Sequence, residues 1–324
     1  MLRPWTLSTL VTLALALPLV ASASVRAPIQ EFTLPHENSR PTSIVTGPDG
    51  ALWFTESSRG VIGRITVSGQ ITEFQLPDHS GPHSITVGAD GALWFTESYA
   101  DRIGRITTKG VITEYAVPTP DSEPWDITAL PDGSLWFTEQ IGKVGVIDRL
   151  GNIREYSTGS GDAPAGITTG PDGNVWFTEE IGNNVVRLVP GDPPTMTEYP
   201  VQRQAALPYD ITTGPDGNLW FTQLYGRHIG KVTPQGQITE YPVPVAMGVF
   251  GIAAGADGRL WFTENDGAVV GSISTNGVPG RRLPVGVYPF GITTGPGGDV
   301  WFVTFFGNTV GRVNVSAQDS SPTD

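Results

Sequence analysis

The sequence predicts an all-β fold, a seven-bladed β-propeller with four antiparallel strands per blade. One block recurs seven times, first as Gly-Pro-Asp-Gly-Ala-Leu-Trp-Phe-Thr-Glu at residues 47–56. A period near forty residues with short apolar runs and turn residues is typical of propeller blades. A helical spacing of apolar residues is nowhere sustained. The tryptophan of the block stands at positions 53, 94, 136, 176, 220, 261 and 301.

A segment with the features of an export signal precedes the repeats. Arg3 supplies a short positive region, residues 7–20 are largely apolar, and Ala21-Ser22-Ala23 fits a cleavage site before Ser24. We therefore expect residues 1–23 to be a signal peptide and the mature protein to be secreted or periplasmic. No other stretch is long and apolar enough to cross a membrane, so membrane insertion is not expected.

Each repeat predicts four short strands. The first follows a proline, as in Pro-Tyr-Asp-Ile-Thr at 208–212, and the second is Leu-Trp-Phe-Thr. The third has the pattern Ile-Gly-Arg-Ile and the fourth Ile-Thr-Glu-Tyr. Asp-Gly in six copies and Gly297-Gly298 in the seventh predict a tight hairpin before the second strand. We expect a type I′ turn there, with positive φ at both central residues.

The two ends of the chain complete one ring. The last repeat stops after its third strand at residues 310–313, and Ile-Gln-Glu-Phe at 29–32 matches the missing fourth strand. Closing the ring with this N-terminal strand leaves no open edge at the junction. We therefore expect a single propeller domain over residues 24–315, followed by a polar tail at 316–324.

Composition excludes several functions. The chain has 324 residues, with 19 Lys and Arg against 32 Asp and Glu and a net charge of -13, so a nucleic-acid partner is not expected. There is no cysteine, and hence no disulfide, thiolate metal site or cysteine nucleophile. No phosphate loop, nucleotide fingerprint, zinc motif or Ser-His-Asp order occurs, so no nucleotide cofactor is expected. We expect a monomer that binds a small-molecule or peptide ligand.

Two positions in each repeat are expected to face the mouth of the central channel, because the first strand of a blade lines that channel. The first position follows the blade proline, which is replaced by Val249 in the sixth blade: Thr42, His83, Trp125, Ala165, Tyr209, Phe250 and Phe290. The second position ends the second strand: Glu56, Glu97, Glu139, Glu179, Gln223, Glu264 and Thr304.

The carboxylates at the second position have two interpretations. Each Glu could have been inherited with the repeat and bond a neighbouring blade, or the five together could form an acidic mouth that holds Mg²⁺ or Ca²⁺. Departures from the repeat favour a site on the second and third blades, where Glu123 is the only carboxylate directly before a blade proline. On this hypothesis Glu97, Glu123 and Glu139 are metal ligands and His83 is the candidate catalytic residue.

Aromatic side chains are the candidate ligand-binding residues. Trp125 is the only tryptophan of the mature chain outside the seven copies, and its flat apolar face suits stacking on an aromatic or sugar ring. The candidates, all from the position after the blade proline, are Trp125, Tyr209, Phe250 and Phe290.

The repeated block, followed by Ile-Gly-Arg-Ile-Thr and Ile-Thr-Glu-Tyr, resembles the virginiamycin B lyase (streptogramin B lyase) family over about residues 29–315. The resemblance implies a seven-bladed propeller. It also implies an enzyme that linearises a cyclic depsipeptide by elimination at an ester, with Mg²⁺ and a histidine base. Such a reaction needs a base for the α-proton and an electrophile for the developing enolate.

The family's catalytic pattern does not match in direct register, where Phe290 stands at the histidine position and Thr304 at the second glutamate. With the ring rotated, Pro82-His83 fits the first element. Glu123 and Glu139 then keep the sixteen-residue spacing, but Trp125 replaces the catalytic histidine. The resemblance therefore supports the fold and a metal site and weakens the case for the lyase reaction.

Three functions follow from these observations. The first is a secreted propeller that binds a small cyclic, peptidic or glycosidic ligand at an acidic and aromatic mouth. The second is a divergent metal-dependent lyase or hydrolase that uses His83, Glu123 and Glu139. The third is an envelope scaffold for protein interactions that has no small-molecule site.

Overall fold

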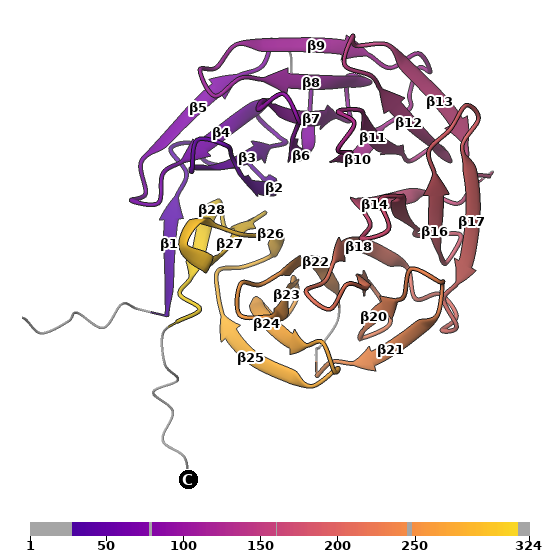
Figure 1. The fold of residues 1–324 in the computed structure, drawn as a ribbon. Helices are drawn as coiled ribbons and strands as arrows, with labels where there is room; N and C mark the ends of the chain where they lie inside the picture. The colour runs from indigo at the N-terminus through magenta and orange to yellow at the C-terminus, as the bar shows by residue number, and fades with distance from the viewer. Residues whose placement is uncertain (1–27, 78–79, 160, 245–247, 317–324) are drawn as a thin grey trace, which may run out of the picture.

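The protein is a ring of seven four-stranded antiparallel sheets in a computed structural model that describes residues 28–77, 80–159, 161–244 and 248–316 (Figure 1). The predicted fold class is confirmed. Among these residues the 3-10 turn η1 (Pro296–Gly298) is the one helical element, and no helix is long and apolar enough to cross a membrane. The predicted signal peptide (1–23) and residues 317–324 of the predicted tail lie outside the described residues.

The first strands of neighbouring blades contact one another around the channel, and the second strands follow them outward. The first strands are β2 (Pro41–Thr46), β6 (Pro82–Val87), β10 (Pro124–Ala129), β14 (Pro164–Thr169), β18 (Pro208–Thr213), β22 (Val249–Ala254) and β26 (Pro289–Thr294). The second strands are β3 (Leu52–Glu56), β7 (Leu93–Glu97), β11 (Leu135–Glu139), β15 (Val175–Glu179), β19 (Leu219–Gln223), β23 (Arg259–Glu264) and β27 (Val300–Thr304).

The third and fourth strands form the outer part of each blade. The third strands are β4 (Val61–Ile65), β8 (Arg102–Ile106), β12 (Lys143–Ile147), β16 (Asn184–Val189), β20 (His228–Val232), β24 (Val269–Ser274) and β28 (Thr309–Val313). The fourth strands are β5 (Ile71–Gln75), β9 (Ile112–Ala116), β13 (Ile153–Ser157), β17 (Thr195–Pro200), β21 (Ile238–Pro242), β25 (Pro279–Pro284) and β1 (Ile29–Thr33).

The N-terminal strand closes the ring as predicted. Strand β1 pairs antiparallel with β28, and Ile29 lies opposite Val313 and Phe32 opposite Val310. In Figure 1 the indigo β1 lies beside the yellow β28 at this seam. The Phe32 ring stacks on that of Trp301 with 5.8 Å between centroids, so the last blade has the aromatic stack found in the first five blades.

The repeated tryptophans fill the spaces between blades. Trp53 of the first blade is fully buried and packs with Ile85 and Phe95 of the second blade. The other six copies are at most 5% exposed. Burying an aromatic ring of this size removes a large apolar area from water, so these contacts hold neighbouring sheets together.

The glycine of the third strand is required by the phenylalanine of the second. A Cβ atom at Gly63 would lie 2.1 Å from the Phe54 ring, which crosses directly over the glycine. The two residues are cross-strand partners in the ladder between β3 and β4. In six blades the two residues therefore recur together, because the glycine leaves the space that the phenylalanine ring fills. The fourth blade is the exception, with Val186 opposite Phe177.

The predicted type I′ hairpin turn is wrong in the six Asp-Gly copies, whereas in the seventh copy Gly297 and Gly298 both have positive φ, as expected. Gly50 has a φ of 73°, but Asp49 is not among the residues with positive φ. The Gly47 N–H donates to the Ala51 carbonyl, and the Gly50 N–H donates to the Gly47 carbonyl. This pattern is that of a type I turn followed by a left-handed glycine. The aspartate keeps ordinary backbone angles and uses its side chain instead.

That aspartate side chain connects the turn to the core. In the first blade, Asp49 accepts a hydrogen bond from Trp53 Nε1 at 3.0 Å and one from Arg64 Nε at 2.7 Å. The third blade departs from this arrangement. There Asp132 accepts from the Ser134 hydroxyl at 2.7 Å, and Trp136 Nε1 has no hydrogen-bond partner among the described residues.

The fourth and third blades therefore provide a matched pair of tryptophans for measuring the contribution of the Trp–Asp hydrogen bond to stability. Trp176 Nε1 donates to Asp172 at 3.0 Å, so Trp176→Phe breaks a bond to a carboxylate, whereas Trp136→Phe removes an unpaired donor. Both substitutions remove the same part of an indole ring. We expect Trp176→Phe to lower the free energy of unfolding by roughly 1–3 kcal/mol more than Trp136→Phe. Denaturant unfolding measures both, and equal losses would contradict the assignment.

Candidate functional site

Threonines of the second strands position the residues that follow the blade prolines. Thr55 Oγ1 donates to the carbonyl of His83 in the next blade, and Thr96 Oγ1 donates to that of Trp125. Thr222 and Thr263 do the same for Phe250 and Phe290. Each contact fixes the backbone at the start of a first strand. The side chain that follows the proline is thereby held at the channel.

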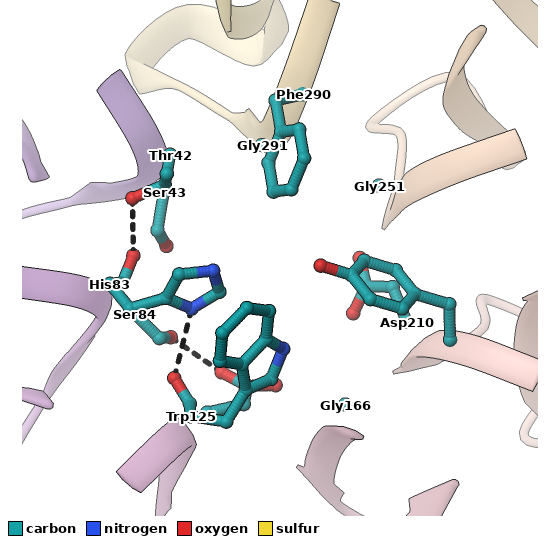
Figure 2. A pocket seen from close by; sticks show the side chains of 12 residues that line it. Thr42, Ser43, His83, Ser84, Trp125, Gly166, Asp210, Gly251, Phe290 and Gly291 are labelled. Atoms are coloured by element: carbon teal, nitrogen blue, oxygen red, sulfur yellow. Dashed lines mark hydrogen bonds between the residues drawn. The ribbon is translucent and has the colours of Figure 1, made fainter. Parts of the chain in front are cut away.

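The rings from five blades meet in the channel, as Figure 2 shows for His83, Trp125 and Phe290. The His83 and Trp125 rings stack with 3.6 Å between centroids. Phe290 contacts His83 edge-on at 6.3 Å and also packs against Phe250 at 5.3 Å. Tyr209 meets Phe250 and Phe290 edge-on. The structure thus brings together all four predicted ligand-binding residues and His83, and their roles stay predictions.

These rings separate two spaces. On the face with the turns between second and third strands, a hollow of about 320 Å³ opens to solvent. We call this hollow the mouth. Below the rings a smaller cavity of about 70 Å³ lies within the channel. The mouth is lined by Arg40, Thr42, Ser57, Gly81, His83, Ser98, Tyr99, Trp125, Tyr209, Phe250, Phe290 and Phe305.

His83 is held as a neutral imidazole. Its Nδ1 lies 3.1 Å from the Trp125 carbonyl oxygen, which can only accept, so Nδ1 carries the proton. Burial among the rings lowers the pKa of His83 to about 4, and the bond to Trp125 opposes this shift only in part. At neutral pH the imidazole is therefore uncharged, with the lone pair on Nε2.

Two aspartates that the sequence analysis did not select lie in the inner cavity. Asp126 accepts from the Ser84 hydroxyl and from the Ile167 N–H, and Asp210 accepts from the Ile252 N–H. Burial raises the pKa of Asp210 to about 8, with the Asp126 carboxyl adding to the shift. The sequence does mark these two aspartates. Both stand two positions after the blade proline, where the other blades have only Ser or Gly.

The second-strand carboxylates do not face the mouth, and this expectation is wrong. Glu97 and Glu139 are fully buried at the ends of β7 and β11, where they line neither the mouth nor the inner cavity. All five residues of a second strand are buried because the strand lies inside its sheet and between two blades. In the first two blades the residue after the glutamate lines the mouth instead, Ser57 after Glu56 and Ser98 after Glu97.

The buried carboxyls face the outer strand of their own blade, where different groups balance them. Glu264 forms a two-pronged ion pair with Arg282, with 2.8 Å between Nη2 and Oε2. Gln223 replaces the acid in the fifth blade and donates to Glu240 at 2.7 Å. In the third blade burial, and then the neighbouring Glu155, raise the pKa of Glu139 to about 9. This arrangement supports the interpretation that the glutamates were inherited with the repeat, but the partners lie in the same blade and not in the neighbouring blade, as was expected.

The predicted metal ligands are not gathered into one site. Glu123 is exposed before β10, with a left-handed φ of 48°, while Glu97 and Glu139 are buried in separate blades. Within the described ranges no group of three or more His, Asp or Glu side chains could hold a metal ion. These residues therefore do not fit the magnesium site that the family resemblance implies.

Glu139 predicts a measurable dependence of stability on pH. Its pKa in the fold, about 9, lies above the ordinary 4.5, so the native state holds the proton more tightly than the unfolded state. The resulting stability is present below pH 4.5 and is lost as the pH rises toward 9. We expect Glu139→Gln to leave the Tm nearly unchanged at pH 4.5 and to raise it by several degrees at pH 8.

The fifth blade supplies the matched control. Gln223→Glu introduces a buried acid beside Glu240 and should lower the Tm at pH 8 more than at pH 4.5. Thermal unfolding followed by circular dichroism measures both variants. If the effect of Glu139→Gln did not change between these pH values, the raised pKa would be refuted.

Comparison with known proteins agrees with this architecture. The sequence model of the virginiamycin B lyase family matches residues 18–193 and 192–320. A streptogramin B lyase structure is 35% identical, covers 88% of this chain and 97% of its own, and superposes with a TM-score of 0.84. Virginiamycin B lyase from Staphylococcus aureus is 36% identical, with 89% and 99% covered and a TM-score of 0.83.

The Staphylococcus aureus enzyme has also been solved as a catalytically inactive histidine-to-alanine variant with quinupristin, which matches at the same identity, coverage and TM-score. The family match spans nearly the whole chain, and the two solved lyase structures superpose on most of it. The protein therefore belongs to the virginiamycin B lyase family.

Proposed function

We propose that the protein is a binding propeller that takes a small cyclic, peptidic or glycosidic ligand at the mouth. The observation that supports this most directly is the hollow of about 320 Å³ walled by aromatic rings from several blades. Its volume and apolar walls are those of a small-molecule site. We also propose that binding takes place outside the cytoplasm, on the strength of the export signal in residues 1–23.

The rings of the mouth are suited to apolar and planar surfaces. Trp125 and Phe290 come from the third and seventh blades, and each is locked by contacts with neighbouring rings. Rings that are already fixed lose little conformational entropy when a ligand binds. A flat ring or apolar side chain of the ligand can therefore stack against them with little reorganisation of the protein.

The chemistry at the mouth favours binding over elimination. A base at the α-proton is needed for the family reaction, but the matching positions hold Trp125 or Phe290, which cannot accept a proton. His83 is the one imidazole that lines the mouth among the described residues, and a pKa of about 4 makes it a weak base at neutral pH. The described carboxyls do not gather into a metal site either.

A divergent lyase or hydrolase is the second candidate. Identity of 35–36% to streptogramin B and virginiamycin B lyases over nearly the whole chain favours it. The uncharged Nε2 of His83 would then act on the substrate directly. The two candidates differ in turnover, and one experiment separates them.

Quinupristin, incubated with the mature protein and Mg²⁺, is the test ligand. We expect calorimetry to detect binding and chromatography to show no linear product. Trp125→Ala should weaken binding by about tenfold or more, because a stacking surface is lost. Tyr225→Ala is the control, since Tyr225 is an exposed aromatic residue that does not line the mouth.

Rapid linearisation that disappears in His83→Ala would overturn the binding assignment and establish the lyase. Binding that is unaffected by Trp125→Ala would move the ligand away from the mouth.

A further inference from the structure

We propose that the mouth selects ligands that carry an acidic group, which Arg40 binds; this rests on the proposed binding function. Arg40 is exposed at the rim and lines the mouth together with the aromatic rings. The repeated glutamates predicted an acidic mouth that attracts cations. With the second-strand glutamates buried elsewhere, the charged side chain that lines the mouth is a cation.

Arg40 is held in place without using its hydrogen-bond donors. Its guanidinium carbon lies 5.6 Å from the ring centroid of Phe305 and 5.9 Å from that of Phe306. Its backbone is fixed as well, because its carbonyl accepts bonds from the Ser57 N–H and hydroxyl. The two rings and this turn fix the position of the guanidinium.

The guanidinium has no carboxylate partner in the described ranges, unlike the arginines of the outer strands. Arg64, Arg105 and Arg187 each pair with the aspartate of their own blade. Arg40 forms neither an ion pair nor a side-chain hydrogen bond with any described residue. Five N–H donors in a planar fork therefore remain available to a ligand.

No carboxylate lies among the described residues that line the mouth. The chain as a whole carries a net charge of -13. The unpaired cation at the mouth therefore has the opposite sign to the net charge of the protein. At physiological ionic strength exposed acids farther away than about 8 Å are largely screened, so the net charge of the chain does not cancel the local attraction of Arg40 for an anion. Asp126 and Asp210 lie in the inner cavity below the rings.

The combination specifies a ligand class. A guanidinium fork matches the oxygens of a carboxylate, sulfonate or phosphate, and it binds them more strongly than it binds a neutral acceptor. Phe290 and Trp125 contribute apolar faces within the same hollow. The ligand class that fits is an organic acid whose body is an aromatic or aliphatic ring system.

Two fluorescent probes with the same ring system separate charge from shape. The probe 8-anilinonaphthalene-1-sulfonate is an anion, and N-phenyl-1-naphthylamine is its uncharged counterpart. Titrated into the mature protein, the anion should bind more tightly. Arg40→Met should weaken binding of the anion by about tenfold, which corresponds to the loss of one charge-assisted hydrogen bond. The affinity for the neutral probe should change by less than about twofold.

Two further variants keep this test decisive. Arg40→Lys keeps the charge and should retain part of the preference for the anion. Arg149→Met removes an exposed arginine in the turn between β12 and β13, on the opposite face of the ring, and should change neither affinity. Thermal unfolding of each variant establishes that it is folded before the titration.

The outcomes are distinguishable. If neither probe binds at a site sensitive to Trp125→Ala, the proposed binding function itself fails. If both probes bind there equally and Arg40→Met alters neither affinity, the mouth is a ligand site without selectivity for acids. Equal weakening of both probes by Arg40→Met would mean that Arg40 shapes the mouth through packing, which also overturns the proposal.

Discussion

The pairing of β1 with β28 is the constraint on which the rest of the structure depends. Without that fourth strand the last blade would present an open edge, and the seventh blade would be held against the first by the contacts of β26 and β27 with β2 without support from an outer strand. The seam also crosses the mouth. Arg40 of the first blade packs on Phe305 and Phe306 of the seventh, and Asn308 bonds the backbone of Ser39 and His36. Closing the ring therefore also assembles the proposed acid-binding group.

The repeated residues fix where the channel-facing side chains lie, and the residues that differ between blades determine their chemistry. The Trp–Phe–Gly packing and the threonine bonds to the next blade are the same in most copies, so the residue after each proline arrives at the channel in a fixed place. What stands there differs from blade to blade, from Ala165 to Trp125. The fold, the closing strand and the ring of aromatic side chains could be predicted because each depends on local pattern and period alone.

The burial of the glutamates, the left-handed turns and the cation could not be predicted in this way. Spacing places Glu97 at the end of a strand, but only the packed blade shows that this end is enclosed and that the next residue, Ser98, reaches the mouth. Arg40 precedes a proline, a position that is occupied in other blades by Gly81 and Tyr288. Its freedom from ion pairs is a property of the assembled ring that no single repeat contains.

The charged groups of the molecule are likewise divided between the buried positions of the repeat and the mouth. The position that holds an acid inside each blade is neutralised in different ways. Gln223 replaces the acid by an amide, Glu264 pairs with an arginine, and burial raises the pKa of Glu139. The mouth is left with aromatic rings, a neutral imidazole and one guanidinium among the residues that line it. This set is suited to holding a ligand and lacks a strong base.

Unfolding of a chain that begins at residue 36 tests the ring-closure account most directly, since it removes β1 and keeps every other strand. Followed by circular dichroism against the mature protein, this chain should melt several degrees lower and with less cooperativity, because a complete strand ladder and the Phe32–Trp301 stack are lost. A transition that coincides with that of the mature protein would show that the ring stands without β1 and would contradict the account.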